Sequence, residues 1–120
     1  MATIEEVRAA LDPDEPDYNQ AKSLGTAAFP ALRQLIEGRD PGLASKATHL
    51  AALIGGDEAE ALVVSASRHP SAVVRVSAAH GASLLEEGTA ERVLQELLED
   101  RDTRVTMASR GALSALRERR

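Results

Sequence analysis

The sequence predicts an all-α fold in which short helices pair as antiparallel hairpins and stack into an α-solenoid. Apolar residues recur at the three- and four-residue spacing of amphipathic helices, and no stretch alternates as a half-buried strand would. Glycine, proline and capping side chains divide the chain into segments of about a dozen residues. Equivalent apolar positions such as Leu43, Val74 and Val105 lie 31 residues apart. Self-similarity at such a period is typical of proteins built from repeated helical pairs.

Composition agrees with that fold and limits the kind of protein. The chain has 120 residues, of which 43% are hydrophobic and only 2% aromatic, so its core must be built from Ala, Leu and Val. It has no cysteine, which excludes disulfides and thiolate chemistry. The N-terminus lacks the apolar region of a signal peptide, and no run approaches the ~20 apolar residues of a membrane span. We therefore expect a single cytoplasmic domain over residues 1–120 that contacts no membrane.

The N-terminal quarter predicts two short helices. Thr3 and Glu6 have the spacing of a capping box, which indicates a helix over residues 4–11. The following segment, DPDEP, ends that helix because proline cannot continue the hydrogen-bond ladder. A second helix is expected over residues 17–24, where Gly25 stops it.

Six further helices follow, and end signals place their boundaries. They are expected at residues 27–37, 41–54, 58–67, 72–86, 90–99 and 103–118. Asp40 with Pro41 is an N-terminal cap, Asp57 with Glu60 is a second capping box, and Thr89 is another cap. Left-handed stops are expected at Gly38, Gly55, Gly56 and Gly88.

The 31-residue offset relates both helices of each predicted hairpin. In the first helices it joins Leu32 to Val63 and Leu94, and in the second helices it joins Leu43 to Val74 and Val105. Each hairpin has one apolar face too wide to bury alone, so neighbouring hairpins must stack. The domain then divides into N-terminal capping helices and three repeats, over residues 1–25, 26–56, 57–88 and 89–120.

The repeats resemble HEAT-like repeats of the phycobilisome-lyase type. The resemblance is carried by DPGLASKATHLAALIGG, HPSAVVRVSAAHGASLL and DRDTRVTMASRGALSAL, and it covers about Thr26 to Leu116. In the first and third of these, an Asp at the inter-helix turn (Asp40, Asp102) precedes an apolar residue by three positions, and an Ala-rich helix follows. The middle repeat has Ser71 instead of the turn Asp, and the Val-Arg pair of the family is present only as Val74-Arg75.

The resemblance implies a right-handed α-α superhelix whose first helices form the convex side and whose second helices line the concave side. Opposite the buried stripe, the second helices carry mostly uncharged residues, and low charge is typical of interface cores. We therefore predict a non-catalytic scaffold module that binds a protein or peptide through this concave face. The other interpretation is that a tightly curved arc has no room for long side chains. The predicted contact residues are Ser45, His49, Ala52, Val76, His80, Ser83, Met107, Arg110 and Ser114.

Metal, cofactor and nucleic-acid binding are not expected. His49 and His80 are one repeat apart and face the same way, but two imidazoles fall short of the three protein ligands that catalytic zinc takes. His69 precedes Pro70 and is interpreted as a loop residue. The chain carries a net charge of −5 and has few rings that could stack on bases, which makes a nucleic-acid partner improbable.

Charge is distributed unevenly along the chain. Residues 1–17 carry six acidic side chains and one Arg, whereas residues 101–120 carry six Arg and two acidic side chains. Homo-oligomers formed by end-to-end stacking are one interpretation. The other, which we favour, is that acidic residues prefer helix N-termini and Arg prefers helix C-termini.

Catalytic motifs are absent from the sequence. There is no G-x-S-x-G elbow, and Gly55-Gly56 lacks the Lys-Ser/Thr of a phosphate-binding loop. The His-Glu pairs of HEAT-like di-iron hydroxylases and the basic, aromatic groove of HEAT-like DNA glycosylases are also missing. The alternative function is an accessory or regulatory subunit of an enzyme complex, such as a chromophore lyase.

Overall fold

A computed structural model describes residues 2–119, and within that range the chain contains helices and no strand. The predicted all-α class is therefore confirmed, while Met1 and Arg120, the ends of the predicted domain, lie outside the described residues. The helices are α1 (Ile4–Leu11), α2 (Tyr18–Ala21), the 3-10 segment η1 (Lys22–Ala28), α3 (Phe29–Glu37), α4 (Pro41–Ile54), α5 (Asp57–Ala66), α6 (Ala72–Ala82), α7 (Glu87–Leu97) and α8 (Thr103–Glu118).

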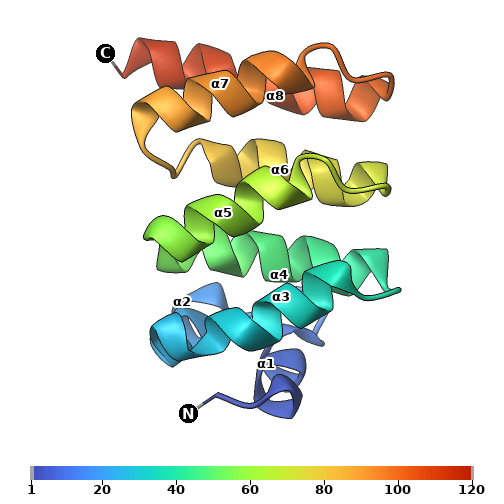
Figure 1. The fold of residues 1–120 in the computed structure, drawn as a ribbon, viewed down its shortest axis with the longest axis vertical. Helices are drawn as coiled ribbons and strands as arrows, with labels where there is room; N and C mark the ends of the chain where they lie inside the picture. The colour runs from blue at the N-terminus through green and yellow to red at the C-terminus, as the bar shows by residue number, and fades with distance from the viewer. Residues whose placement is uncertain (1, 120) are drawn as a thin grey trace.

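The helices are arranged in two layers along the longest axis of the molecule (Figure 1). One layer contains α3, α5 and α7, and the other contains α4, α6 and α8, with α4 packed on α6 and α6 packed on α8. The chain alternates between the layers, so that α3 pairs with α4, α5 with α6, and α7 with α8. The N-terminal helices cover the lower end of the stack, and the molecule measures 36 × 28 × 22 Å.

Most of the apolar residues 31 apart are buried to a similar extent, as the pattern predicts. Leu32, Val63 and Leu94 of the first layer are each 0% exposed. In the second layer Val74 and Val105 are also 0% exposed, whereas Leu43 is half-buried against the N-terminal helices. Small side chains such as Ala fill the contacts between α4, α6 and α8, which lets these helices approach closely without aromatic residues.

Several predicted helix ends are confirmed. The Thr3 hydroxyl accepts the Glu6 N–H at 3.2 Å, and Asp40 accepts the Leu43 N–H at 3.2 Å at the start of α4. The bounds of α4 and α8 coincide with those expected. Gly25, Gly55 and Gly56 have positive φ angles of 66°, 79° and 97°, a region that glycine enters without steric cost.

Other end signals were misinterpreted. Gly38 is extended, with φ −75° and ψ −176°, and Gly88 lies inside α7, so neither is a left-handed stop. The Glu86 carboxylate accepts the N–H groups of Gly88 and Thr89, which starts α7 three residues earlier than predicted and removes Thr89 as a cap. The capping box of Asp57 and Glu60 is also wrong, because Asp57 is already helical behind Gly56.

Two expected helices are shorter than predicted. The helix expected over residues 17–24 is instead α2, which ends at Ala21, followed by η1, which contains Gly25 in a non-helical conformation. The helix over residues 72–86 ends at Ala82, where the Ser83 hydroxyl donates to the His80 carbonyl at 2.8 Å and the chain turns toward α7. The bounds of α1 are those predicted, and the remaining helix ends lie within two residues of the expected positions.

The turns between paired helices are joined across the stack by buried polar contacts. Arg75 Nε donates to Asp100 Oδ2 at 2.8 Å, and both side chains are 10% exposed. The same guanidinium donates to the carbonyls of His69 and Pro70, at 2.8 and 3.0 Å, so it connects two successive turns. His69, predicted only as a loop residue, places Nε2 3.0 Å from the Ile36 carbonyl, and its Nδ1 accepts the backbone N–H of the residue after Pro70.

Candidate functional site

The surface formed by α4, α6 and the start of α8, here named the second-helix face, carries a pocket of about 450 Å³. Four of the predicted contact residues meet in it: Ser45, His49, Val76 and His80. The pocket is lined by these residues and by Tyr18, Lys46, Val73, Ser77 and Arg104. Its lining therefore contains apolar, aromatic and cationic side chains and no carboxylate.

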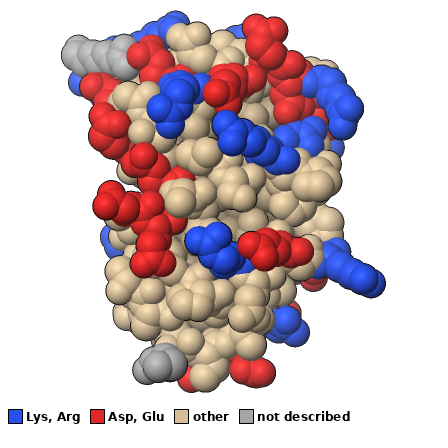
Figure 2. Space-filling view, viewed as in Figure 1, with Lys and Arg blue, Asp and Glu red and all other residues tan. Residues whose placement is uncertain are grey.

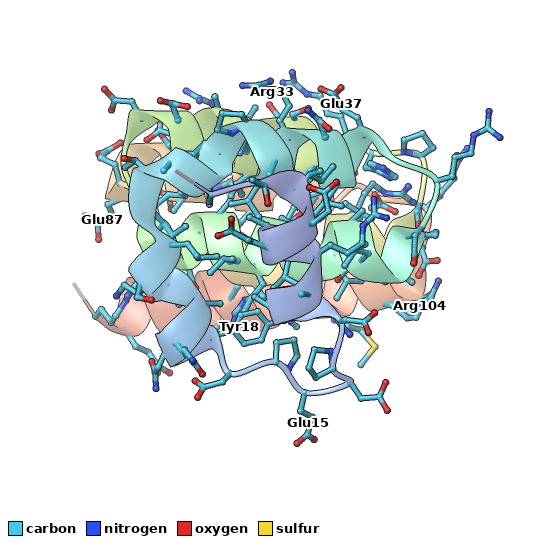
Figure 3. The ribbon with its side chains drawn as sticks, turned by 90° about the horizontal axis from the view of Figure 1, so that it is seen from below. Glu15, Tyr18, Arg33, Glu37, Glu87 and Arg104 are labelled. Atoms are coloured by element: carbon cyan, nitrogen blue, oxygen red, sulfur yellow. The ribbon has the colours of Figure 1, made fainter. Side chains whose placement is uncertain are left out.

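Tyr18 forms part of this site, although no pattern in the sequence pointed to it. Asp17 caps α2 by accepting the Gln20 N–H at 3.1 Å, which fixes the first residue of that helix beside α4. The Tyr18 ring meets the His49 ring edge to face, with centroids 4.5 Å apart and planes at 80°. Such an arrangement is a favourable aromatic contact. Figure 3 shows Tyr18 near the side of the molecule from which the loop with Glu15 projects.

Burial favours the uncharged form of both rings of this pair. Loss of solvent raises the pKa of Tyr18 above its usual 10.0. Burial, and secondarily the neighbouring His80, lower the pKa of His49 below its usual 6.5. Desolvation disfavours the charged form of each group, which explains the opposite directions of the two shifts. The floor of the pocket is accordingly a neutral, polarisable surface.

Polar side chains at the pocket are mostly engaged within the protein. Ser77 Oγ donates to the Ser45 carbonyl at 2.7 Å, which ties α6 to α4. Lys46 Nζ donates to the carbonyls of Asp12 and Pro13, at 3.4 and 2.7 Å. These contacts fix the lining in place and leave Val73, which is 40% exposed, and His80 open to solvent.

Arg104 borders the pocket on the α8 side, which is here named the far rim, and it is held by Asp102 at the start of α8. Its Nε and Nη2 donate to the two carboxylate oxygens of Asp102, at 3.2 and 3.0 Å. These bonds and the Arg104 N–H lower the pKa of Asp102 to about 2. The carboxylate is therefore ionised at neutral pH, and the pair has little net charge.

The other predicted contact residues do not join this pocket. Ala52 is 3% exposed and packs against α6, so its prediction as a contact residue is wrong. Met107 is 62% exposed on α8, one repeat beyond Val76. Arg110 and Ser114 lie at the end of the stack, in a separate pocket of about 410 Å³ that also includes Leu98.

A larger groove, which the sequence did not predict, lies on the opposite layer. It has a volume of about 1130 Å³ and is formed by α5, the C-terminal end of α3 and the turns that follow them. Figure 2, which views this layer, shows an uncharged central region bordered by acidic and basic side chains. The charged residues of the groove lining are Glu37, Arg39, Asp57, Glu60 and Arg68. Two of them are engaged with α7: Glu60 accepts the Thr89 hydroxyl at 3.0 Å, and Arg68 lies 3.8 Å from a Glu96 carboxylate oxygen.

The basic C-terminal segment is partly used in internal contacts. Arg117 lies 3.5 Å from Glu91 of α7, and Arg119 donates to the Ser83 carbonyl at the end of α6, at 3.0 Å. A cation beside the C-terminal carbonyls of a helix is favourable. These contacts are consistent with the helix-terminus interpretation of the charge bias, and end-to-end stacking stays a prediction.

Metal-ligand groups and membrane-spanning helices are not found in residues 2–119. No cluster of three or more His, Cys, Asp or Glu side chains there has an arrangement that could hold a metal ion. Nor is any of those helices both long and apolar enough to cross a bilayer. Comparison of the chain with protein-family models and with curated proteins finds no match.

Proposed function

We propose that this chain is a small solenoid of HEAT-like helical hairpins that acts as a non-catalytic scaffold, binding a protein or peptide partner through its second-helix face. The repeat assignment is supported by the joint burial of residues 31 apart and by the alternation of α3 to α8 between two layers. Stacked hairpins of this kind present one helix of every pair on a common surface, which suits them to binding extended partners.

The observation that carries the proposal is the pocket at Tyr18 and His49, together with apolar side chains exposed around it. Val73 and Met107 are 40% and 62% exposed, and only Leu84 joins them among the large hydrophobic residues exposed within residues 2–119. Two of these three therefore belong to helices of the second-helix face. Aromatic residues and Met are enriched in protein interfaces, and carboxylates are depleted.

The arrangement of polar groups favours binding over catalysis. A nucleophile needs a base within hydrogen-bond reach, and that base needs an orienting partner. Here the hydroxyl of Ser77 donates to a backbone carbonyl, and the pocket lining offers no carboxylate to orient His49 or His80. The groove on the α3 and α5 side is the less favourable docking surface, because five charged side chains line it and charged residues are depleted in the cores of interfaces.

The test is a selection of linear random peptides displayed on phage, with the wild-type chain as bait. Peptides that it enriches are then titrated against a Val76→Glu/Met107→Glu variant by fluorescence anisotropy. We expect a loss of affinity of at least about tenfold, since each new carboxylate must be desolvated against an apolar surface.

Leu84→Glu/Ala61→Glu is the matched control, because it adds the same two charges at exposed apolar positions off this face. Circular dichroism must show unchanged helix content in both variants. Enriched peptides that bind the Val76→Glu/Met107→Glu variant as tightly as wild type would show that the second-helix face is not the binding surface.

A further inference from the structure

The pocket of the second-helix face is bordered on one side by a strongly acidic loop. Residues 12–17, here named the acidic loop, connect α1 to α2, and they carry exposed carboxylates at Asp12, Asp14, Glu15 and Asp17. In Figure 3 this loop projects from the side on which Tyr18 lies, with Glu15 at its outer edge. Tyr18, which follows the loop directly, is part of the pocket lining.

The position of the loop is fixed relative to the pocket. Lys46 lines the pocket and donates to the carbonyls of Asp12 and Pro13. Because these bonds go to backbone oxygens, they hold the loop without forming an ion pair with its side chains. Asp17 is also held, since its carboxylate caps α2.

The charge beside the pocket is therefore negative and largely unpaired. Two cations lie beside the loop: Lys46 donates to its Pro13 carbonyl, and Arg8 lines a depression together with Asp12 and Pro13. Against these two, the loop has four carboxylates, and Asp14 and Glu15 are exposed with no hydrogen bond or ion pair within residues 2–119. At the far rim, Arg104 is neutralised by Asp102. A partner side chain with positive charge is thus favoured at the loop end of the pocket only.

We propose that the pocket takes an apolar side chain of a partner peptide segment whose neighbouring residues on one side are Lys or Arg, and that these basic residues lie on the acidic loop. The inference rests on the proposed function and adds the chemistry of the partner. Val73, Val76 and the Tyr18 ring supply the apolar contact, and the loop supplies charge complementarity. Complementary charge at an interface rim speeds encounter and selects among partners.

The same peptide selection tests this inference through charge-reversal variants. Asp14→Lys/Glu15→Lys cancels the net negative charge of the loop, while Glu37→Lys/Glu58→Lys makes the same net change at exposed positions on α3 and α5. We expect enriched peptides to carry a Lys or Arg cluster beside a large apolar residue. Their affinity should fall about tenfold or more in the loop variant, remain near wild type in the control, and decrease as salt is added.

The possible outcomes separate this inference from the proposed function. Peptides that lose affinity in the Val76→Glu/Met107→Glu variant but bind the loop variant and its control equally would overturn the basic-partner inference and leave the proposed function intact. Enrichment of acidic peptides, or of none above a bait-free selection, would also overturn the inference. The last experiment is sedimentation of the wild-type chain at low salt. If the chain self-associates and the loop variant does not, the occupant of the pocket is a second copy of this chain, and the proposal is contradicted.

Discussion

Helices α6 and α8 occupy equivalent positions in successive hairpins but have different surroundings. α6 packs between α4 and α8, whereas α8 packs on α6 and α7. The difference is visible at one register position, occupied by Thr48, Ala79 and Arg110 in the three helices. Thr48 and Ala79 are 0% exposed against the next helix, and Arg110 is exposed. At this register position the side chain is therefore small where another helix packs against it, and it is a long cation where the position faces solvent.

Two glycines, at different register positions of α6 and α8, differ in the space around them. A Cβ added to Gly81 of α6 would lie 3.0 Å from the Ala52 Cβ of α4, which is attached directly to backbone and cannot rotate away. A Cβ added to Gly111 of α8 would meet nothing within 4 Å. Close approach of the helices thus explains Gly81, and nothing in the structure explains Gly111.

The largest effect is expected where α6 is anchored to the α7–α8 turn. Arg75→Ala removes the partner of buried Asp100 and leaves two turn carbonyls without their donor. Breaking a buried pair in this way lowers the free energy of unfolding by about 3–5 kcal/mol. Urea denaturation monitored by circular dichroism measures this loss of unfolding free energy.

Thr106, the α8 residue at the same register position, provides the control. Its hydroxyl donates only to the Thr103 carbonyl of its own helix, at 3.0 Å. Thr106→Ala should change the free energy of unfolding by no more than about 0.5 kcal/mol. Equal losses in the two variants would mean that the Arg75 contacts do not distinguish α6 from α8.

The next effect is expected at Gly81. Gly81→Ala must push α4 and α6 apart, and overpacking of this kind costs about 1–3 kcal/mol. The gain in helix propensity from alanine, about 1 kcal/mol, offsets part of that cost. We therefore expect a net decrease in the urea midpoint, and an unchanged or higher midpoint would show that the contact between the helices is looser than the structure has it.

The Arg75–Asp100 contact should also depend on pH. Burial acts to raise the pKa of Asp100, but the hydrogen bonds from Arg75 and from the Asp102 N–H outweigh it and lower that pKa below 3.8. A depressed pKa in the folded state stabilises the protein above the unfolded value of about 3.9, and this stabilisation is lost as pH falls through the folded value. The difference in unfolding free energy between wild type and Arg75→Ala should therefore shrink below about pH 4. A difference that is constant from neutral pH to acid would contradict the assigned ion pair.

The smallest effect is expected at Gly111 and has the opposite sign to that at Gly81. Gly111→Ala adds a side chain in open space within a helix, and it should raise the free energy of unfolding by about 1 kcal/mol or slightly less. Thermal denaturation of the Gly111→Ala variant, compared with wild type and with Gly81→Ala, is sufficient to detect this stabilisation. A destabilised Gly111→Ala variant would mean that α8 meets a neighbour at this position in solution.

Local signals predicted most of the fold, because helical periodicity and capping act within a few residues. The bounds of α4 and α8 follow from Asp40 and Asp102, whose carboxylates accept the first N–H groups of those helices. Gly38 and Gly88 were misinterpreted because a glycine stop depends on the path of the chain beyond it. Glu86 provides a cap that overrides Gly88, and the spacing alone did not reveal it.

Only those residues of the candidate site that belong to the 31-residue sequence pattern were predicted. His49, Val76 and His80 were found because equivalent positions share a face. Tyr18 was missed because it comes from the N-terminal segment, which has no counterpart in the repeats. The Arg75 contacts were missed for a similar reason: Asp100 is 25 residues away, and the pairing depends on the conformation of two turns.

The most direct test of the central claim, that the second-helix face binds a peptide partner, is an NMR titration of the labelled protein with the peptide most enriched by selection. We expect the chemical-shift changes to concentrate at four residues that line one pocket: Tyr18, His49, Val76 and His80. Changes that concentrate instead at Ile36, Val64 and Ser65, which line the larger groove on the other layer, would contradict it.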